Sequence, residues 1–182
     1  MARSRGSSPS NPPWKARKTL RIVVEGDDEE AFVNHVRKLF VHRGSGLSVS
    51  VKNAHGKGAR NVIKAAIRER RQGGYDRVAA LFDTDTNWGQ TEKMMAKKGK
   101  VDTLPSAPCL EASLLLMLGD DPSGETAAIL KNRLESRLGG YPPRHPQAGL
   151  SIFTMERIIS NRANIPMIDQ LLTLLGIPPS LS

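Results

Sequence analysis

The sequence has little cysteine, few aromatic residues and no long apolar run. Its single cysteine, Cys109, excludes an internal disulfide and a thiolate cluster for zinc, and it fits a reducing compartment. Aromatic residues make up 4% of the chain, which argues against a single-strand binder built on aromatic stacking. The most apolar run, residues 112–118, is too short to cross a bilayer, and residues 1–19 lack the apolar stretch of a secretory signal. We therefore expect a soluble cytoplasmic protein with no membrane partner.

Positive charge is abundant by contrast. The formal net charge is +9 and the sequence pI is about 10.1. A polyanion is the natural partner of such a chain, and nucleic acid is the first candidate. The alternative is that the charge only keeps the protein in solution.

Short apolar runs alternate with helical patterns along much of the chain. The expected strands are residues 19–24, 47–51, 77–82 and 101–104. Helices are expected from residue 27 to about 43, between 58 and 73, around 93–100, and over 111–118, 127–138, 155–162 and 167–175. This alternation predicts an α/β fold with a doubly wound, mainly parallel sheet, whose working site lies at the carboxyl ends of its strands.

Composition divides the chain into three parts. Residues 1–17 are basic and rich in serine and proline, which predicts a disordered arm. Residues 18–120 carry the strand and helix alternation and form the expected α/β domain. Residues 121–182 hold helical patterns without strands and form the expected helical C-terminal extension.

Two of the expected strands end in carboxylates. Glu25 follows the first strand, and Asp83 and Asp85 follow the third. If the chain stays extended through Asp85, the two aspartates point the same way, because side chains alternate with a period of two. Carboxylates brought together repel one another unless a cation offsets their charge, and Mg²⁺ prefers oxygen ligands. The alternative is that these residues only cap the helices that follow.

A glycine-rich basic loop follows the second strand on the same expected edge. His55, Lys57 and Arg60 lie in the sequence HGKGAR, where glycines let backbone N–H groups approach a phosphate. The spacing is not that of a P-loop. We interpret the three residues as candidates for phosphate or nucleic-acid binding, with a plain flexible loop as the alternative.

Three segments together resemble a known family. VVEGDDE at residues 23–29 resembles the first Toprim motif, and LFDTDT at residues 81–86 resembles its Asp-x-Asp motif. With PCLEASLLL at residues 108–116, they resemble the small RloB-like Toprim proteins, which are related to the OLD-type nucleases and linked to bacterial restriction and defence. The resemblance spans roughly residues 20–118.

The resemblance implies roles for five acidic residues. Glu25 would act as general acid/base or metal ligand, Asp83 and Asp85 would bind Mg²⁺ with Mn²⁺ as a substitute, and Glu29 would support a second metal. Glu111 matches an acidic position of the third segment, where a solvent-facing or ion-paired role is the alternative.

The function that follows is a magnesium-dependent phosphodiesterase, a nuclease acting on DNA or RNA, in bacterial or phage defence. One alternative is a non-catalytic nucleic-acid-binding or regulatory subunit that works with a partner ATPase. A second is an Asp-dependent phosphatase, because Asp83-Thr84-Asp85 distantly resembles the haloacid-dehalogenase motif. That family carries its motif on the first strand, with a glycine after the second aspartate, and this sequence has neither feature.

Overall fold

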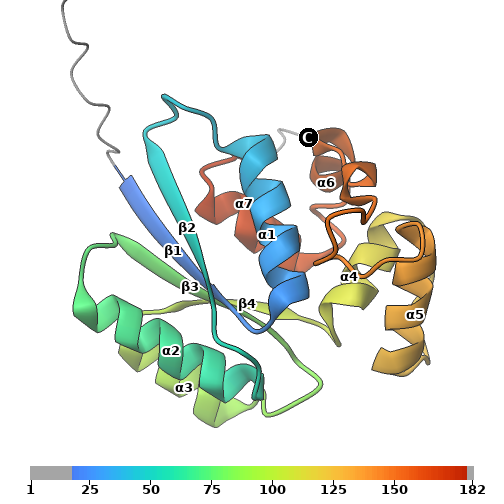
Figure 1. Ribbon diagram of the computed structural model, residues 1–182. Helices are drawn as coiled ribbons and strands as arrows, with labels where there is room; N and C mark the ends of the chain where they lie inside the picture. The colour runs from blue at the N-terminus through green and yellow to red at the C-terminus, as the bar shows by residue number, and fades with distance from the viewer. Residues whose placement is uncertain (1–17, 180–182) are drawn as a thin grey trace, which may run out of the picture.

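A four-stranded parallel sheet forms the centre of the molecule. The computed structural model describes residues 18–179. The sheet has the order β2-β1-β3-β4, and every neighbouring pair is parallel. The strands are β1 (Lys18–Val24), β2 (Leu47–Asn53), β3 (Arg77–Asp83) and β4 (Asp102–Ser106). The expected α/β fold with a doubly wound parallel sheet is confirmed (Figure 1).

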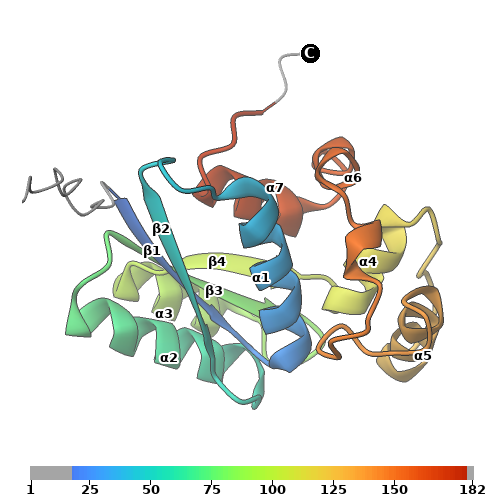
Figure 2. The same ribbon diagram turned by 45° about the horizontal axis from the view of Figure 1, so that its top comes forward.

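Helices cover both faces of this sheet. The helices are α1 (Asp27–Phe40), α2 (Gly58–Gln72), α3 (Gln90–Gly99), α4 (Leu110–Met117), α5 (Ala127–Arg137), α6 (Met155–Ser160) and α7 (Pro166–Leu174), with a short 3₁₀ turn η1 (Leu150–Ile152). Helices α2 and α3 lie on one face, and α1 and α7 lie on the other (Figures 1 and 2). Helices α4, α5 and α6 extend beyond the carboxyl ends of the strands.

The two central strands are apolar because they are buried on both faces. In β3, Ala79 and Leu81 point into the core under α1, whereas Ala80 and Phe82 point into the core under α2 and α3. All four side chains are fully buried. Continuous apolar runs of this kind are typical of central parallel strands. The alternation also places Asp83 on the α1 face of the sheet, since it follows Ala79 and Leu81 at a spacing of two.

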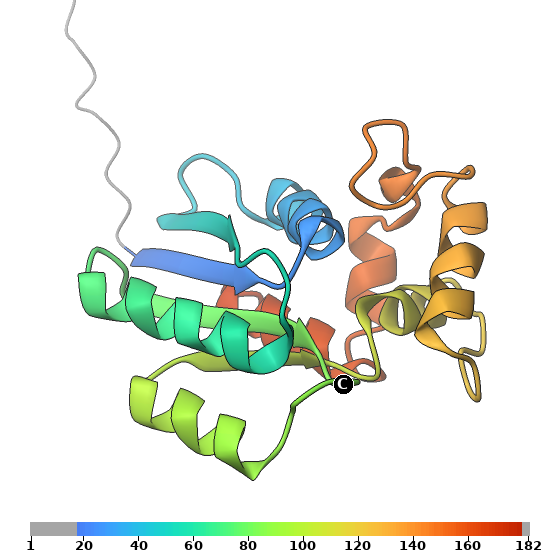
Figure 3. The ribbon, with the colours of Figure 1, turned by 60° about the horizontal axis from the view of Figure 1, so that its bottom comes forward.

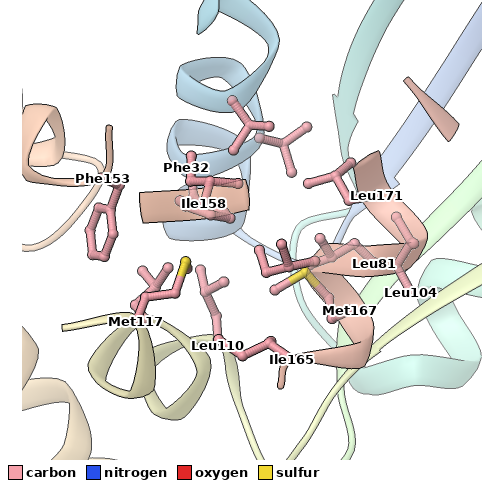
Figure 4. Packing of buried hydrophobic residues seen from close by; sticks show 14 of the residues in the cluster. Phe32, Leu81, Leu104, Leu110, Met117, Phe153, Ile158, Ile165, Met167 and Leu171 are labelled. Atoms are coloured by element: carbon pink, nitrogen blue, oxygen red, sulfur yellow. The ribbon is translucent and has the colours of Figure 1, made fainter. Parts of the chain in front are cut away.

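The larger core joins the sheet to the C-terminal helices. Phe32 of α1 packs edge-to-face on Phe153, with ring centroids 5.9 Å apart. Ile158 and Leu171 lie in the same cluster, as Figure 4 shows. The predicted division at residue 120 stays a prediction, although one continuous core contains residues from both sides of it. The predicted arm at residues 1–17 lies outside the described residues.

Several element boundaries differ from the sequence prediction by one to three residues. Helix α1 ends at Phe40 rather than near Arg43, because Val41 already has extended backbone angles (φ −111°, ψ 99°). Strand β3 ends at Asp83, and residues 84–87 bend away from the strand direction. Within residues 18–179, no helix is long and apolar enough to span a membrane.

Candidate metal centre at the carboxyl edge of the sheet

Four carboxylates meet where β1 and β3 end. Glu25 directly follows β1, Asp83 is the last residue of β3, and Glu29 and Glu111 lie in the first turns of α1 and α4. The negative charges of Glu25, Glu29 and Glu111 all act on Asp83. Glu29 and Glu111 are only 8% and 9% exposed. The topology of a parallel sheet thus collects acidic groups that are up to 86 residues apart in the chain (Glu25 to Glu111).

Asp83 is the most perturbed of these groups. Burial raises its pKa to about 8, and repulsion from Glu29, Glu111 and Glu25 adds to that effect. One hydrogen bond opposes the shift, because the backbone N–H of Leu110 donates to Oδ1 at 2.9 Å. This bond fixes the carboxylate between the end of β3 and the start of α4.

Glu29 lies in a similar environment. Burial raises its pKa to about 7, and the charges of Glu111, Glu25 and Asp28 raise it further. Gly26 provides the space for this side chain, since a Cβ at that position would lie 3.0 Å from Oε2 of Glu29. A residue with a side chain at position 26 would therefore crowd the carboxylate.

Among the described residues, no basic side chain is paired with these four carboxylates. Within residues 18–179, no lysine, arginine or histidine forms an ion pair with Glu25, Glu29, Asp83 or Glu111. Buried carboxylates without a partner destabilise a fold unless they are protonated or bind a cation. The cluster therefore has the electrostatic character of a cation site.

Glu25 is held by the backbone around it. Its Oε1 accepts the N–H of Gly58 at 3.0 Å, and its Oε2 accepts the N–H of Asp83 at 3.3 Å. Its carbonyl oxygen accepts the N–H of Gly56 at 2.7 Å. Glu25 thus ties the end of β1 to the loop before α2 and to the end of β3, and each carboxylate oxygen keeps a lone pair for another partner.

Asp85 is more exposed than the four carboxylates of the cluster. It is not among the leading charges that raise the pKa of Glu29 or Asp83. The expectation that Asp83 and Asp85 point the same way required an extended chain, and the bend after Asp83 removes that condition. The backbone N–H of Asp85 instead donates to the carbonyl of Pro108 at 3.2 Å.

The glycine-rich loop wraps around Glu25. Residues 55–58 all have positive φ, including His55 at 58° and Lys57 at 75°. Left-handed conformations cost non-glycine residues of order 1–3 kcal/mol each, so the surrounding hydrogen bonds must hold the loop in place. His55 and Lys57 are exposed at this edge. Arg60 is engaged elsewhere, because its guanidinium pairs with Glu92 at 2.6 Å.

The donor set fits a hard divalent cation with much of its water retained. No group of three or more His, Cys, Asp and Glu side chains within the described chain is arranged tightly enough to enclose a metal ion. Mg²⁺ does not require such an enclosure, because it usually binds one or two carboxylates and keeps several waters. Asp83 and Glu29 are carboxyl oxygen donors without a cationic partner in the described part of the chain, and they suit that mode.

Sequence reasoning missed the contacts that frame the cluster. Arg144, in the loop after α5, donates to Asp28 from both its backbone N–H (2.9 Å) and its guanidinium (2.6 Å). Lys131 of α5 adds a longer ion pair to Asp28 at 3.8 Å. A single arginine in a proline-rich loop carries no local signal of this pairing, since the two residues are 116 positions apart.

Cys109 and His35 have packing roles. Burial raises the pKa of the Cys109 thiol to about 12, so it is not a nucleophile at neutral pH. The Nε2 of His35 lies 2.9 Å from the carbonyl oxygen of Phe153, which connects α1 to the C-terminal region.

Comparison of the chain with protein-family models, with curated proteins and with solved structures finds no match. The functional argument therefore depends on the geometry and charge of the site.

Proposed function

We propose that the protein is a magnesium-dependent phosphodiesterase of Toprim type that acts on nucleic acid. The observation that carries the proposal is a pair of carboxylates at the carboxyl edge, Glu29, which is buried, and Asp83, which is partly buried. The pKa values of both are raised, and neither has a cationic partner within residues 18–179. The resemblance of the VVEGDDE and LFDTDT segments to Toprim motifs supports the same residues. The net charge of +9 supports a polyanionic substrate.

Asp83 and Glu29 are the residues proposed to hold the metal, with Glu111 at their side. A bound Mg²⁺ would neutralise the cluster and polarise a phosphoryl oxygen. The Leu110 N–H keeps Asp83 oriented at 2.9 Å, and Gly26 leaves Glu29 the space that it occupies. Asp85, exposed on the following bend, is an outer carboxylate in this proposal.

Glu25 is the proposed proton-transfer residue. Two backbone N–H groups fix both of its oxygens at the edge of the sheet. Each oxygen keeps a lone pair that can accept a hydrogen from an attacking water, and a fixed orientation favours such a transfer.

A cleavage assay tests the proposal. Plasmid, single-stranded DNA and tRNA are incubated with the protein in Mg²⁺, Mn²⁺ or EDTA, alongside Asp83→Asn. Glu156→Gln, which removes an exposed carboxylate on α6, is the matched control. We expect metal-dependent cleavage that falls by about 10²–10³-fold in Asp83→Asn and is retained in the control. Cleavage that persists in EDTA or in Asp83→Asn would overturn the proposal.

One observation favours a second function. The carboxylates do not enclose a metal by themselves within residues 18–179, which suits a non-catalytic nucleic-acid-binding subunit that acts with a partner such as an ATPase. Metal-independent binding of nucleic acid without cleavage of any of the three substrates would support this function over the first.

A further inference from the structure

The outward side of α2 and α3 carries only positive charge. We name it the α2–α3 face and define it by its exposed cations: Lys64, Arg68, Arg71, Lys97, Lys98 and Lys100. Figure 3 shows the two helices side by side on one face of the sheet. Within residues 18–179, none of these six side chains forms an ion pair.

The acidic residues of the same helices are withdrawn from this face. Glu69 is the one acidic residue of α2 and Glu92 the one of α3. Both are buried, Glu69 against Arg21 and Lys52, and Glu92 against Arg60. The face therefore has no exposed negative charge to offset its cations.

An apolar groove lies between the two helices, and four of the cations line it: Lys64, Arg68, Arg71 and Lys98. Two adjoining hollows of about 420 and 430 Å³ share Ile67, Arg71 and Met95 in their walls. Met94 lines one of them and is 48% exposed. Gly99 keeps the helices close, since a Cβ there would lie 2.4 Å from Cγ1 of Ile67.

The α2–α3 face starts beside the acidic cluster. The N–H of Gly58, the first residue of α2, donates to Glu25, so the amino end of α2 adjoins the cluster. Helix α2 has 15 residues and is about 22 Å long, which spans about six phosphates at the 3.4 Å spacing of a stacked strand.

We infer that the α2–α3 face binds single-stranded nucleic acid, with phosphates along the cations and unpaired bases on the methionine-lined groove. This inference extends the proposed function, because it names the form of the substrate and the surface that leads it to the acidic cluster. Single strands are favoured over a duplex because an apolar groove contacts the faces of unpaired bases, which a duplex hides by stacking. The cations account for affinity and its salt dependence.

Fluorescence anisotropy with a labelled oligonucleotide, single-stranded or annealed, tests the inference in EDTA, where metal-dependent cleavage cannot occur. The test variant reverses three cations of α2: Lys64→Glu, Arg68→Glu and Arg71→Glu. The control reverses three exposed cations elsewhere: Lys18→Glu, Lys38→Glu and Arg43→Glu. Both triple variants change the net charge equally.

We expect the α2 variant to lose at least tenfold in single-strand affinity, and its log–log salt slope to fall by about 2, because three phosphate contacts are removed. The control should change far less. A neutral triple with glutamine at residues 64, 68 and 71, whose folding is verified by its thermal transition, should show an intermediate loss. Equal losses in the α2 and control variants would overturn the inference.

Met94→Gln tests the groove separately. We expect it to weaken single-strand binding about threefold and to leave duplex binding unchanged, because only unpaired bases reach the groove. Tighter binding of the duplex than of the single strand would overturn the inference. If the protein is not a nuclease, the result would differ: no cleavage would occur, but single strands would still bind to this face.

Discussion

Helices α1 and α3 begin with the same local sequence pattern but have opposite electrostatic surroundings. Each follows an extended glycine, Gly26 or Gly89, and each carries a buried glutamate at its third position, Glu29 or Glu92. Both helices start at the carboxyl edge of the sheet, where the helix dipole favours a carboxylate.

The difference between the two lies in the partner. A hydrogen bond from Arg60 to Glu92 holds the pKa of Glu92 below its ordinary value. Glu29 has no such partner within the described residues, and burial raises its pKa to about 7. The same local motif therefore completes an ion pair in α3 and leaves unbalanced charge in α1. This unbalanced charge supports the proposal that the cluster binds an external cation.

Replacing each of the two glutamates by glutamine should give the largest difference between α1 and α3. We expect Glu29→Gln to lower metal-dependent cleavage by about 100-fold, because loss of a ligand costs at least as much as loss of a residue that orients one. Glu92→Gln should keep cleavage within about threefold, since its partner is Arg60 and not a metal. Initial rates at saturating Mg²⁺ check both. Equal losses would show that the two glutamates do not differ in the way that the account requires.

In the absence of metal, replacing a paired carboxylate by its amide should lower the free energy of unfolding. Replacing an unpaired carboxylate should raise it. Glu69→Gln leaves Arg21 and Lys52 without their buried partner and should lower the free energy of unfolding by roughly 2–3 kcal/mol. Asp83→Asn removes a repelling charge and should raise it by about 1 kcal/mol at pH 9. Urea unfolding in EDTA measures both changes. A loss of stability in Asp83→Asn at that pH would contradict the account.

The pH dependence of stability also distinguishes the unpaired carboxylates from the paired ones. The folded chain raises the pKa of Asp83 from 3.8 to about 8 and that of Glu29 from 4.5 to about 7. Because the folded state binds these protons more tightly than the unfolded state, the stabilisation is present below pH 4 and is lost as the pH rises through 7 to 8. We expect the free energy of unfolding to fall by several kcal/mol between about pH 5 and 8.5 in EDTA, because a shift of one pKa unit corresponds to about 1.4 kcal/mol.

Saturating Mg²⁺ should flatten this slope, because a bound cation offsets the charge that appears on deprotonation. Groups with lowered pKa values, such as Glu92, titrate below this window and serve as an internal reference. A slope that is the same in Mg²⁺ and in EDTA would count against a cation at the cluster.

The smallest expected effect comes from the two glycines. A Cβ on Gly26 would lie 3.0 Å from Oε2 of Glu29, whereas one on Gly89 would lie 3.5 Å from Oε2 of Glu92. Gly26→Ala should therefore weaken Mg²⁺ binding by about threefold, a change of less than 1 kcal/mol. Gly89→Ala is the matched control and should leave Mg²⁺ affinity unchanged. Calorimetric titration compares them, and identical affinities in the two variants would contradict the crowding argument.

Sequence patterns predicted the architecture because the relevant signals are local. Short apolar, β-branched or alternating runs identified all four described strands. A parallel sheet then places Glu25, which follows β1, and Asp83, which ends β3, at one edge. The position of Asp85 could not be predicted in this way, since it depends on a bend that begins one residue after the strand.

Charge pairing between distant residues was also beyond the sequence. Glu29 and Glu92 follow the same pattern, and only the packing of α2 against α3 places Arg60 beside one of them. The pairing of Arg144 with Asp28 likewise depends on how the C-terminal region packs on α1. Local sequence patterns indicate whether a segment is a helix or a strand. Which charged residues form ion pairs depends on how those helices and strands pack in the tertiary structure.

Thermal unfolding at pH 8 over a Mg²⁺ titration, with wild type beside Asp83→Asn, tests the central claim most directly. A ligand that binds only the folded state stabilises it by RT ln(1 + [L]/Kd), about 2.7 kcal/mol at one hundred times Kd. The account predicts a saturable rise in Tm for wild type that an equal ionic strength of NaCl does not reproduce, and no such rise for Asp83→Asn. No Mg²⁺-specific rise in wild type, or an equal rise in both proteins, would contradict a cation site at this cluster.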